Sequence, residues 1–129
     1  MIGILIIAHG TLGEALVDDV VHVLNKRPPQ LAQLGVASQE DPLDLLPMAQ
    51  NILRQVDSGD GVLVLTDVWG ATPSNVAVKL LLPGRVEGVA GVSLPMLLRA
   101  LTYRNKDMET LVTKAVSGGR DGVIHMEPI

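Results

Sequence analysis

The 129-residue sequence contains no cysteine and no phenylalanine, and its only aromatic residues are Trp69 and Tyr103. Without cysteine the chain forms no disulfide, no thiolate nucleophile and no cysteine-ligated zinc site, which fits a reducing compartment. Hydrophobic residues make up 47% of the chain and charged residues 19%, proportions that are typical of a compact globular protein. We therefore expect a folded domain with an aliphatic core.

An excess of basic residues and long hydrophobic runs are also missing. The formal net charge is -4 and the lysines and arginines are scattered, which argues against nucleic acid as a partner. The apolar stretch from Met1 to Ala8 is far shorter than the roughly 20 residues that span a bilayer, and it lacks the basic leader of a signal peptide. We expect a cytoplasmic protein that meets a membrane only through a partner, if at all.

Apolar runs and amphipathic stretches alternate along the chain. The expected strands cover Ile2–Ala8, Leu31–Val36, Val62–Thr66, Val86–Ser93 and a short final strand, Val123–Met126. The expected helices cover Thr11–Leu24, Pro42–Val56, Thr72–Leu81, a short segment from Pro95, and Asp107–Ser117. This alternation predicts one α/β domain over residues 1–129, a three-layer doubly wound parallel sheet with the common strand order 2-1-3-4.

Ligands of such sheets bind at the carboxyl ends of the strands, near the point where the strand order reverses. This rule selects His9 after the first strand, Asp67 after the third and Ser93 after the fourth. The same loops lead into helix N-termini, whose free N–H groups and positive dipole end favour a bound phosphate. We therefore expect an anion site beside His9 and Asp67.

Imidazole is a suitable reversible carrier of phosphate, because it is nucleophilic and partly neutral near its unperturbed pKa of about 6.5. A carboxylate beside one ring nitrogen keeps the proton there and leaves the other nitrogen bare, as in serine hydrolases. His9 and Asp67 supply such a pair, although a lone histidine at a strand end is more often an ordinary loop residue. Structural roles are expected for His22 in the first helix and His125 in the last strand.

Four segments together resemble the mannose-family enzyme IIA domain of the bacterial phosphoenolpyruvate-dependent sugar phosphotransferase system. The segments, in chain order, are Ile6–Gly10, Asp67–Pro73, Gly91–Leu97 and Gly119–Val123. The His-Gly pair alone is a weak signal, whereas the Asp-Val-Trp-Gly-Ala-Thr-Pro segment is specific. The resemblance extends over nearly the whole chain.

The resemblance implies a phosphoryl carrier in sugar uptake or its regulation. His9 would accept phosphate from the phosphocarrier protein HPr and pass it to an enzyme IIB component, with a membrane permease as an indirect partner. Asp67 would hydrogen-bond His9, and the phosphate would be bound by Trp69, Gly70, Thr72 and Ser74. No cofactor or metal is expected. The resemblance also implies that the final strand is antiparallel and is exchanged in a homodimer.

Two departures from the family pattern concern small residues: Ser93 replaces a frequent asparagine and Ala71 replaces a common glycine. Three other functions remain open from the residues. One is the related phosphotransferase subunit of dihydroxyacetone kinase, which the Trp-Gly-x-Thr-Pro loop disfavours. The second is a metal-dependent hydrolase using His9, Asp67 and His125, although no close ligand cluster is present. The third is a sensor that binds a small molecule without covalent phosphate.

Overall fold

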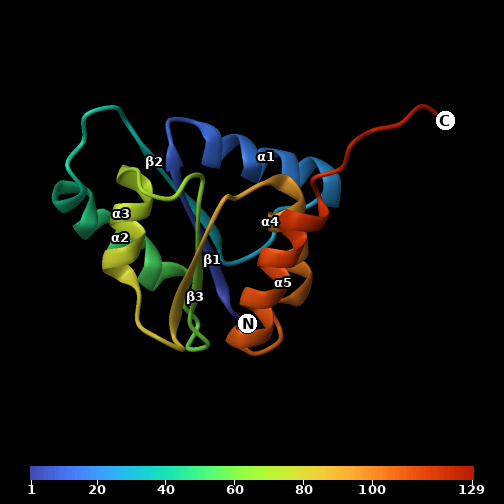
Figure 1. Cartoon of the computed structure of the whole chain (residues 1–129). Coiled ribbons are helices and arrows are strands. Elements are labelled where there is room, and N and C mark those ends of the chain that lie inside the picture. Colours follow the sequence, from blue (N-terminus) through green and yellow to red (C-terminus); the bar gives the residue numbers. More distant parts are fainter.

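Strands and helices alternate through most of the chain in the computed structural model, which describes all 129 residues (Figure 1). The strands are β1 (Gly3–His9), β2 (Leu31–Val36), β3 (Val62–Thr66) and β4 (Val86–Ala90). The helices are α1 (Leu12–Leu24), α2 (Pro42–Val56), α3 (Thr72–Leu80), α4 (Leu94–Tyr103) and α5 (Met108–Asp121). None of these helices has the length and apolar character needed to cross a membrane.

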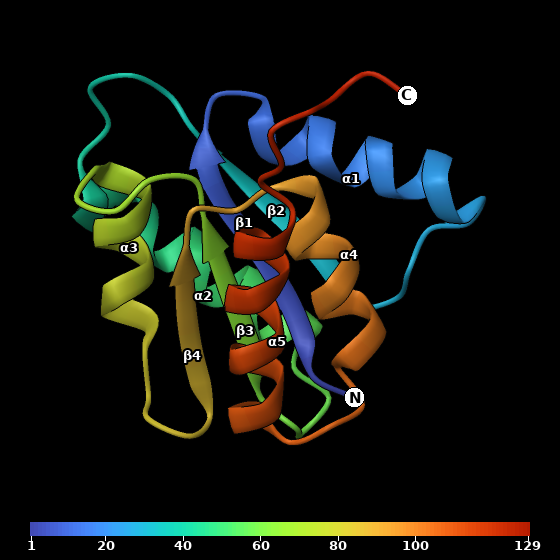
Figure 2. The same cartoon turned by 45° about the vertical axis from the view of Figure 1, so that its right-hand side comes forward.

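The four strands form one parallel sheet in the order β2-β1-β3-β4, which confirms the predicted topology. All four strands point toward the same edge, at the top of Figure 2, which we call the carboxyl edge. The opposite edge, where the strands begin, is the amino edge. In the sheet register Ile7 lies beside Thr66, and Thr66 lies beside Ala90, so these strand ends are neighbours. β4 ends at Ala90, three residues before Ser93, the predicted end of this strand.

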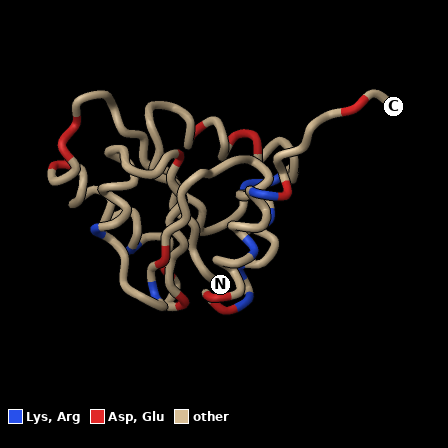
Figure 3. The backbone as a smooth tube through the Cα atoms, viewed as in Figure 1, with Lys and Arg blue, Asp and Glu red and all other residues tan.

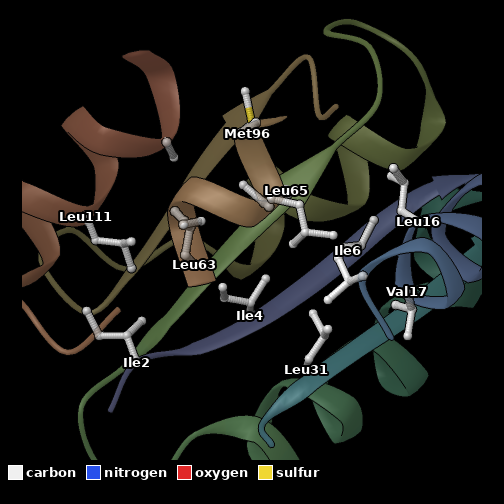
Figure 4. Close-up of a cluster of buried hydrophobic side chains, with 14 of the residues drawn as sticks. Ile2, Ile4, Ile6, Leu16, Val17, Leu31, Leu63, Leu65, Met96 and Leu111 are labelled. Carbon is white, nitrogen blue, oxygen red and sulfur yellow. The ribbon is translucent and has the colours of Figure 1, made fainter. Parts of the chain in front are cut away.

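Helices cover both faces of the sheet and enclose two aliphatic clusters, as the strand alternation predicts. Alternate residues of β1 point to opposite faces: Ile4 and Ile6 pack under α1, α4 and α5, whereas Leu5 and Ile7 pack under α2 and α3. Figure 4 shows the first cluster, in which side chains from the sheet meet those of the three helices. The molecule is thus the three-layer α/β domain expected from the sequence.

Two helices begin at aspartate residues whose carboxylates cap the helix N-terminus. The Asp41 carboxylate accepts a hydrogen bond from the Leu43 N–H at 2.9 Å, with Pro42 as the first helical residue of α2. The Asp107 carboxylate accepts from the Thr110 N–H at 2.7 Å at the start of α5. Thr72 is the first helical residue of α3, and Ala71 occupies the N-cap position without a side-chain hydrogen bond.

The C-terminal prediction needs correction, since Val123–Met126 forms no strand in the single chain. α5 continues to Asp121 rather than ending near Ser117, and the residues from Gly122 onward are exposed and leave the body of the molecule (Figure 1). Gly118 and Gly119 lie inside the helix, where a Cβ on Gly118 would approach the Arg99 Cβ to 2.9 Å. These glycines let α5 pack closely on α4, and the exchange of the segment between two copies stays a prediction.

Candidate active site

The loops after β1, β3 and β4 lie side by side at the carboxyl edge and lead into α1, α3 and α4. This arrangement follows from the parallel order, because β1 pairs with β3 and β3 pairs with β4. The loop residues 10–11, 37–41, 67–71 and 91–93 contain no lysine or arginine, and the basic residues of the chain lie elsewhere (Figure 3). An anion at this edge would therefore depend on N–H groups, hydroxyls and helix N-termini.

His9 and Asp67 meet at this edge, as predicted from their positions after neighbouring strands. The distance between His9 Nδ1 and Asp67 Oδ2 is 2.7 Å, and the same carboxylate oxygen accepts the His9 backbone N–H at 3.0 Å. The other carboxylate oxygen accepts the Val68 N–H at 3.0 Å. Because an ionised carboxylate only accepts hydrogen bonds, Nδ1 carries the proton of the neutral imidazole and Nε2 is left as the bare nitrogen.

The His9 side chain is more exposed than the Asp67 side chain, as expected if His9 reacts and Asp67 orients it. The His9 side chain is 50% exposed, whereas the Asp67 side chain is only 13% exposed. Burial tends to raise the pKa of Asp67, but hydrogen bonds from the His9 backbone and ring, and the charge of His9, hold that pKa below its ordinary value. The carboxylate is therefore ionised and largely shielded from solvent, while Nε2 of the half-exposed His9 ring makes no hydrogen bond within the chain.

The loop between β3 and α3 is held by its own hydrogen bonds. The Ser74 hydroxyl accepts the Gly70 N–H at 2.8 Å and donates to the Ala71 carbonyl at 2.9 Å. Ser74 is 2% exposed, and Gly70 adopts a positive φ of 91°, a conformation that glycine accommodates without strain. Ser74 thus fixes the turn from inside, and its hydroxyl proton is already engaged.

Thr72 and Trp69, unlike Ser74, have groups that remain free to contact a ligand or partner. The Thr72 hydroxyl makes no hydrogen bond within the chain, and Thr72 opens α3, where the first N–H groups lack intrahelical partners. Trp69 is 73% exposed at the tip of the loop. Its ring also borders an apolar hollow of about 110 Å³ between α3 and β4, lined by residues that include Leu81 and Val89.

The other residues considered from the sequence make no hydrogen bond with His9 or Asp67. Ser93 caps α4, its hydroxyl accepting the Met96 N–H at 3.3 Å. His22 is exposed in the last turn of α1, and His125 is exposed beyond α5. No group of three or more histidine, cysteine, aspartate or glutamate side chains comes together where it could hold a metal ion.

One feature of the site has no signal in the sequence. The backbone N–H of His9 donates to the Asp67 carboxylate, so His9 helps to position the carboxylate that in turn orients its own ring. A backbone donor is present at every residue except proline, and only the register between β1 and β3 selects this one.

The protein is a three-layer α/β domain with a histidine, oriented by a carboxylate, at the carboxyl edge of its parallel sheet. Comparisons with known proteins identify the family to which it belongs. The model of the EIIA-man family, described as "PTS system fructose IIA component", matches residues 3–116. The chain therefore belongs to this family of phosphotransferase-system (PTS) IIA components, as the sequence resemblance predicts.

Individual relatives agree with the family match. Over 125 residues the chain is 32% identical to the PTS system mannose-specific EIIAB component of Escherichia coli strain K12. That alignment covers 95% of this chain and 38% of the relative, so the chain spans well under half of that protein.

Solved structures share the fold. The mannose/sorbose-specific IIA subunit of the phosphotransferase system from Enterococcus faecalis superposes with a TM-score of 0.87 at 20% identity, covering 99% of this chain and 96% of that chain. The phosphotransferase system component EIIA from Streptococcus agalactiae gives a TM-score of 0.84 at 23% identity, covering 97% of each chain. At these identities the likeness supports the three-layer fold alone.

Proposed function

We propose that the protein is a phosphoryl carrier of the sugar phosphotransferase system, with the phosphate carried on Nε2 of His9. The observation that carries the proposal is the 2.7 Å contact of His9 Nδ1 with Asp67, which leaves Nε2 bare and accessible. HPr would be the donor and an enzyme IIB component the acceptor, in the cytoplasm and with a membrane permease further downstream. Family membership favours this function over the dihydroxyacetone kinase subunit, the metal hydrolase and the sensor.

The transfer needs only groups that the chain supplies. The Nε2 lone pair attacks the phosphorus atom while the bond from phosphorus to the donor breaks, and the phosphoryl group moves without gain or loss of a proton at Nε2. The ring becomes more positive when Nε2 is phosphorylated, and the ionised Asp67 beside Nδ1 stabilises that charge. Reversal with an acceptor returns His9 to its starting state, so positioning and electrostatics carry the reaction without a nucleotide or metal.

The phosphoryl oxygens would lie against the loop from Trp69 to Ser74. The first N–H groups of α3 and the free Thr72 hydroxyl are suitable donors, and no lysine or arginine from the carboxyl-edge loops competes for the anion. Gly70 lets the loop turn with open space beside it, and Ser74 holds that turn. Trp69 would form the exposed wall of the site and a contact for protein partners.

The C-terminal segment would complete a homodimer. β4 lies at the end of the sheet, its outer side paired only through the Leu82–Val86 bridge, and an apolar hollow of about 110 Å³ lies beside it. The exposed apolar residues Val123, Ile124 and Met126 of a second copy provide a strand that can cover both. Sedimentation of the full chain and of a chain ending at Gly122 tests this assembly: dimers in the first and monomers in the second are expected.

Phosphoryl transfer is tested with the full chain, phosphoenolpyruvate, enzyme I and HPr. We expect one acid-labile, base-stable phosphate per chain and a faster-migrating species on a native gel, because the phosphate adds about two negative charges. His9→Ala should abolish labelling, while the matched controls His22→Ala and His125→Ala keep it. Label that persists in His9→Ala would assign the carrier role to another residue, and an unlabelled wild type with several HPr sources would favour the sensor.

A further inference from the structure

A second hollow lies at the amino edge of the sheet, on the opposite side of the molecule from His9. It measures about 600 Å³, within the range of small-molecule sites, and opens between the α1–β2 connection and the end of α4. Its apolar walls include Val23, Leu24, Leu98 and Leu101. The basic residues in its lining are Arg104 and Lys26, and we call it the Arg104 hollow.

Arg104 is an unusual residue for the floor of such a hollow. It is only 4% exposed, yet its guanidinium makes a single hydrogen bond, from Nη1 to the Gln30 carbonyl at 3.3 Å. No carboxylate pairs with it, and burial lowers its pKa from the ordinary value. Buried charges are normally paired, so most of the five N–H donors of this guanidinium lack the partner that burial calls for.

The remaining donors of Arg104 still reach solvent. The only fully buried side-chain nitrogen or oxygen without a partner in the chain is Gln33 Oε1, so the unbonded Arg104 nitrogens retain some accessible surface. Arg104 lines this hollow and an adjoining one, and a ligand in the Arg104 hollow could meet these donors. A planar fork of N–H groups matches a carboxylate or phosphate better than it matches water.

The charges around the hollow have one sign. Lys26 is exposed on its rim, Thr102 and Asn105 add neutral polar groups, and no aspartate or glutamate belongs to its lining. Asp60 and Asp107 line an adjoining hollow, which Arg104 and Asn105 also border. A cationic floor beneath aliphatic walls selects a ligand with an anionic head and an apolar body.

We propose that the Arg104 hollow binds a small organic anion, a carboxylate or phosphomonoester whose oxygens meet Arg104 and Lys26 and whose apolar body lies against Leu98 and Leu101. The site is independent of phosphoryl transfer, because β1 separates it from His9. At about 3.3 Å per residue, the seven residues of β1 place the two sites roughly 20 Å apart.

Nuclear magnetic resonance titration of the full chain tests the proposal. The probes are 3-phenylpropionate for the carboxylate, phenyl phosphate for the phosphomonoester, and uncharged 3-phenylpropan-1-ol as the control for apolar contact alone. We expect saturable amide shifts at Leu101, Thr102 and Asn105 with one or both anions, and much weaker shifts with the alcohol. The anion that binds more tightly identifies the head group.

Variants of the full chain separate binding from folding. Arg104→Gln should weaken the anion at least about tenfold, since it removes a charge-assisted bidentate contact. Asn105→Asp, an exposed and nearly isosteric change, should weaken it about threefold by adding a negative charge, and it reports even if Arg104→Gln fails to fold. Lys79→Gln on α3 is the matched control and should change nothing. Equal shifts with the alcohol, shifts confined to the His9 loops, or an affinity unaffected by Asn105→Asp would each overturn the proposal.

Discussion

The two edges of the sheet are built from the same four strands but are finished in opposite ways. At the amino edge, the Gln30 amide donates to the Met1 and Val56 carbonyls, and the Gln30 carbonyl accepts both the Ile4 N–H and Arg104. At the carboxyl edge, the His9 ring is half exposed and Trp69 protrudes. Hydrogen bonds at the amino edge connect separate segments of the chain, whereas the side chains at the carboxyl edge remain accessible.

Gly3 and Gly70, one at each edge, are needed for different reasons. A Cβ on Gly3 at the amino edge would lie 2.2 Å from the Val56 carbonyl oxygen, so only hydrogen fits between the start of β1 and the end of α2. A Cβ on Gly70 at the carboxyl edge would meet nothing within 4 Å. Gly70 is needed for its positive φ, and Gly3 for close packing. We therefore expect a Cβ to be more costly at Gly3 than at Gly70.

The largest effect should come from overfilling the amino edge. We expect Gly3→Ala to lower the free energy of unfolding by about 3 kcal/mol, because the methyl group forces backbone atoms apart. Gly70→Ala should cost only about 1 kcal/mol, the strain of a positive φ without a steric clash. Urea denaturation of both variants measures the difference. Equal losses would contradict the division between the two edges.

Exchanging a carboxylate for an amide should separate function from stability. Asp67→Asn should slow phosphoryl acceptance about 100-fold while the chain stays folded, because an amide can present either end to Nδ1 and holds the tautomer less firmly. Asp57 is the matched control, since its carboxylate accepts the Gly59 and Gly61 N–H groups and pairs with Arg85 at 2.9 Å. Asp57→Asn should cost about 1–2 kcal/mol of stability with an unchanged transfer rate. A slow Asp57→Asn variant would show that the edges are coupled.

Removing one hydroxyl at the carboxyl edge should have a smaller effect. Thr72→Val deletes a free hydroxyl beside the proposed phosphate site, and we expect about tenfold slower transfer with a nearly unchanged melting temperature. Thr113→Val is the control, because Thr113 is exposed on α5 and its hydroxyl donates to the Glu109 carbonyl. A Thr72→Val protein that melts early, while its folded fraction transfers at the normal rate, would make Thr72 a structural residue.

The smallest effect should be the acid dependence of stability. The Gly59 N–H lowers the pKa of Asp57, the Thr110 N–H lowers that of Asp107, and the pKa of Asp67 is low despite burial. A carboxyl whose pKa is lower in the folded state binds protons more readily when unfolded. Its contribution is therefore complete above the unfolded pKa of about 4 and is lost as the pH falls below it.

Denaturation midpoints measured between pH 6 and pH 3 check this prediction. They should fall only as the pH drops to about 4 and below. The decline should be shallower in Asp57→Asn than in the wild type. An equally steep decline in that variant would assign the acid sensitivity to other carboxyl groups.

Much of the fold could be predicted because the signals are local. The unbroken apolar run of β1 and the helical spacing in α1 report their own burial, and the parallel order follows from strand–helix alternation. The position of His9 and Asp67 after neighbouring strands was enough to predict their pairing. The end of α5 was predicted too early because Gly118 lies inside the helix, where the absence of a side chain lets α5 approach Arg99 of α4, a contact that forms only when the two helices pack.

The sequence by itself determined the alternation of elements, the aliphatic core, the edge at which chemistry belongs and the family. Only the tertiary structure decided which nitrogen of His9 is bare, that Ser74 is occupied within its loop, and that Arg104 is buried without a carboxylate. Burial and helical periodicity are written in the order of side chains along the chain. Hydrogen-bond partners and unpaired charges depend on distances between segments far apart in the sequence, and packing alone sets those distances.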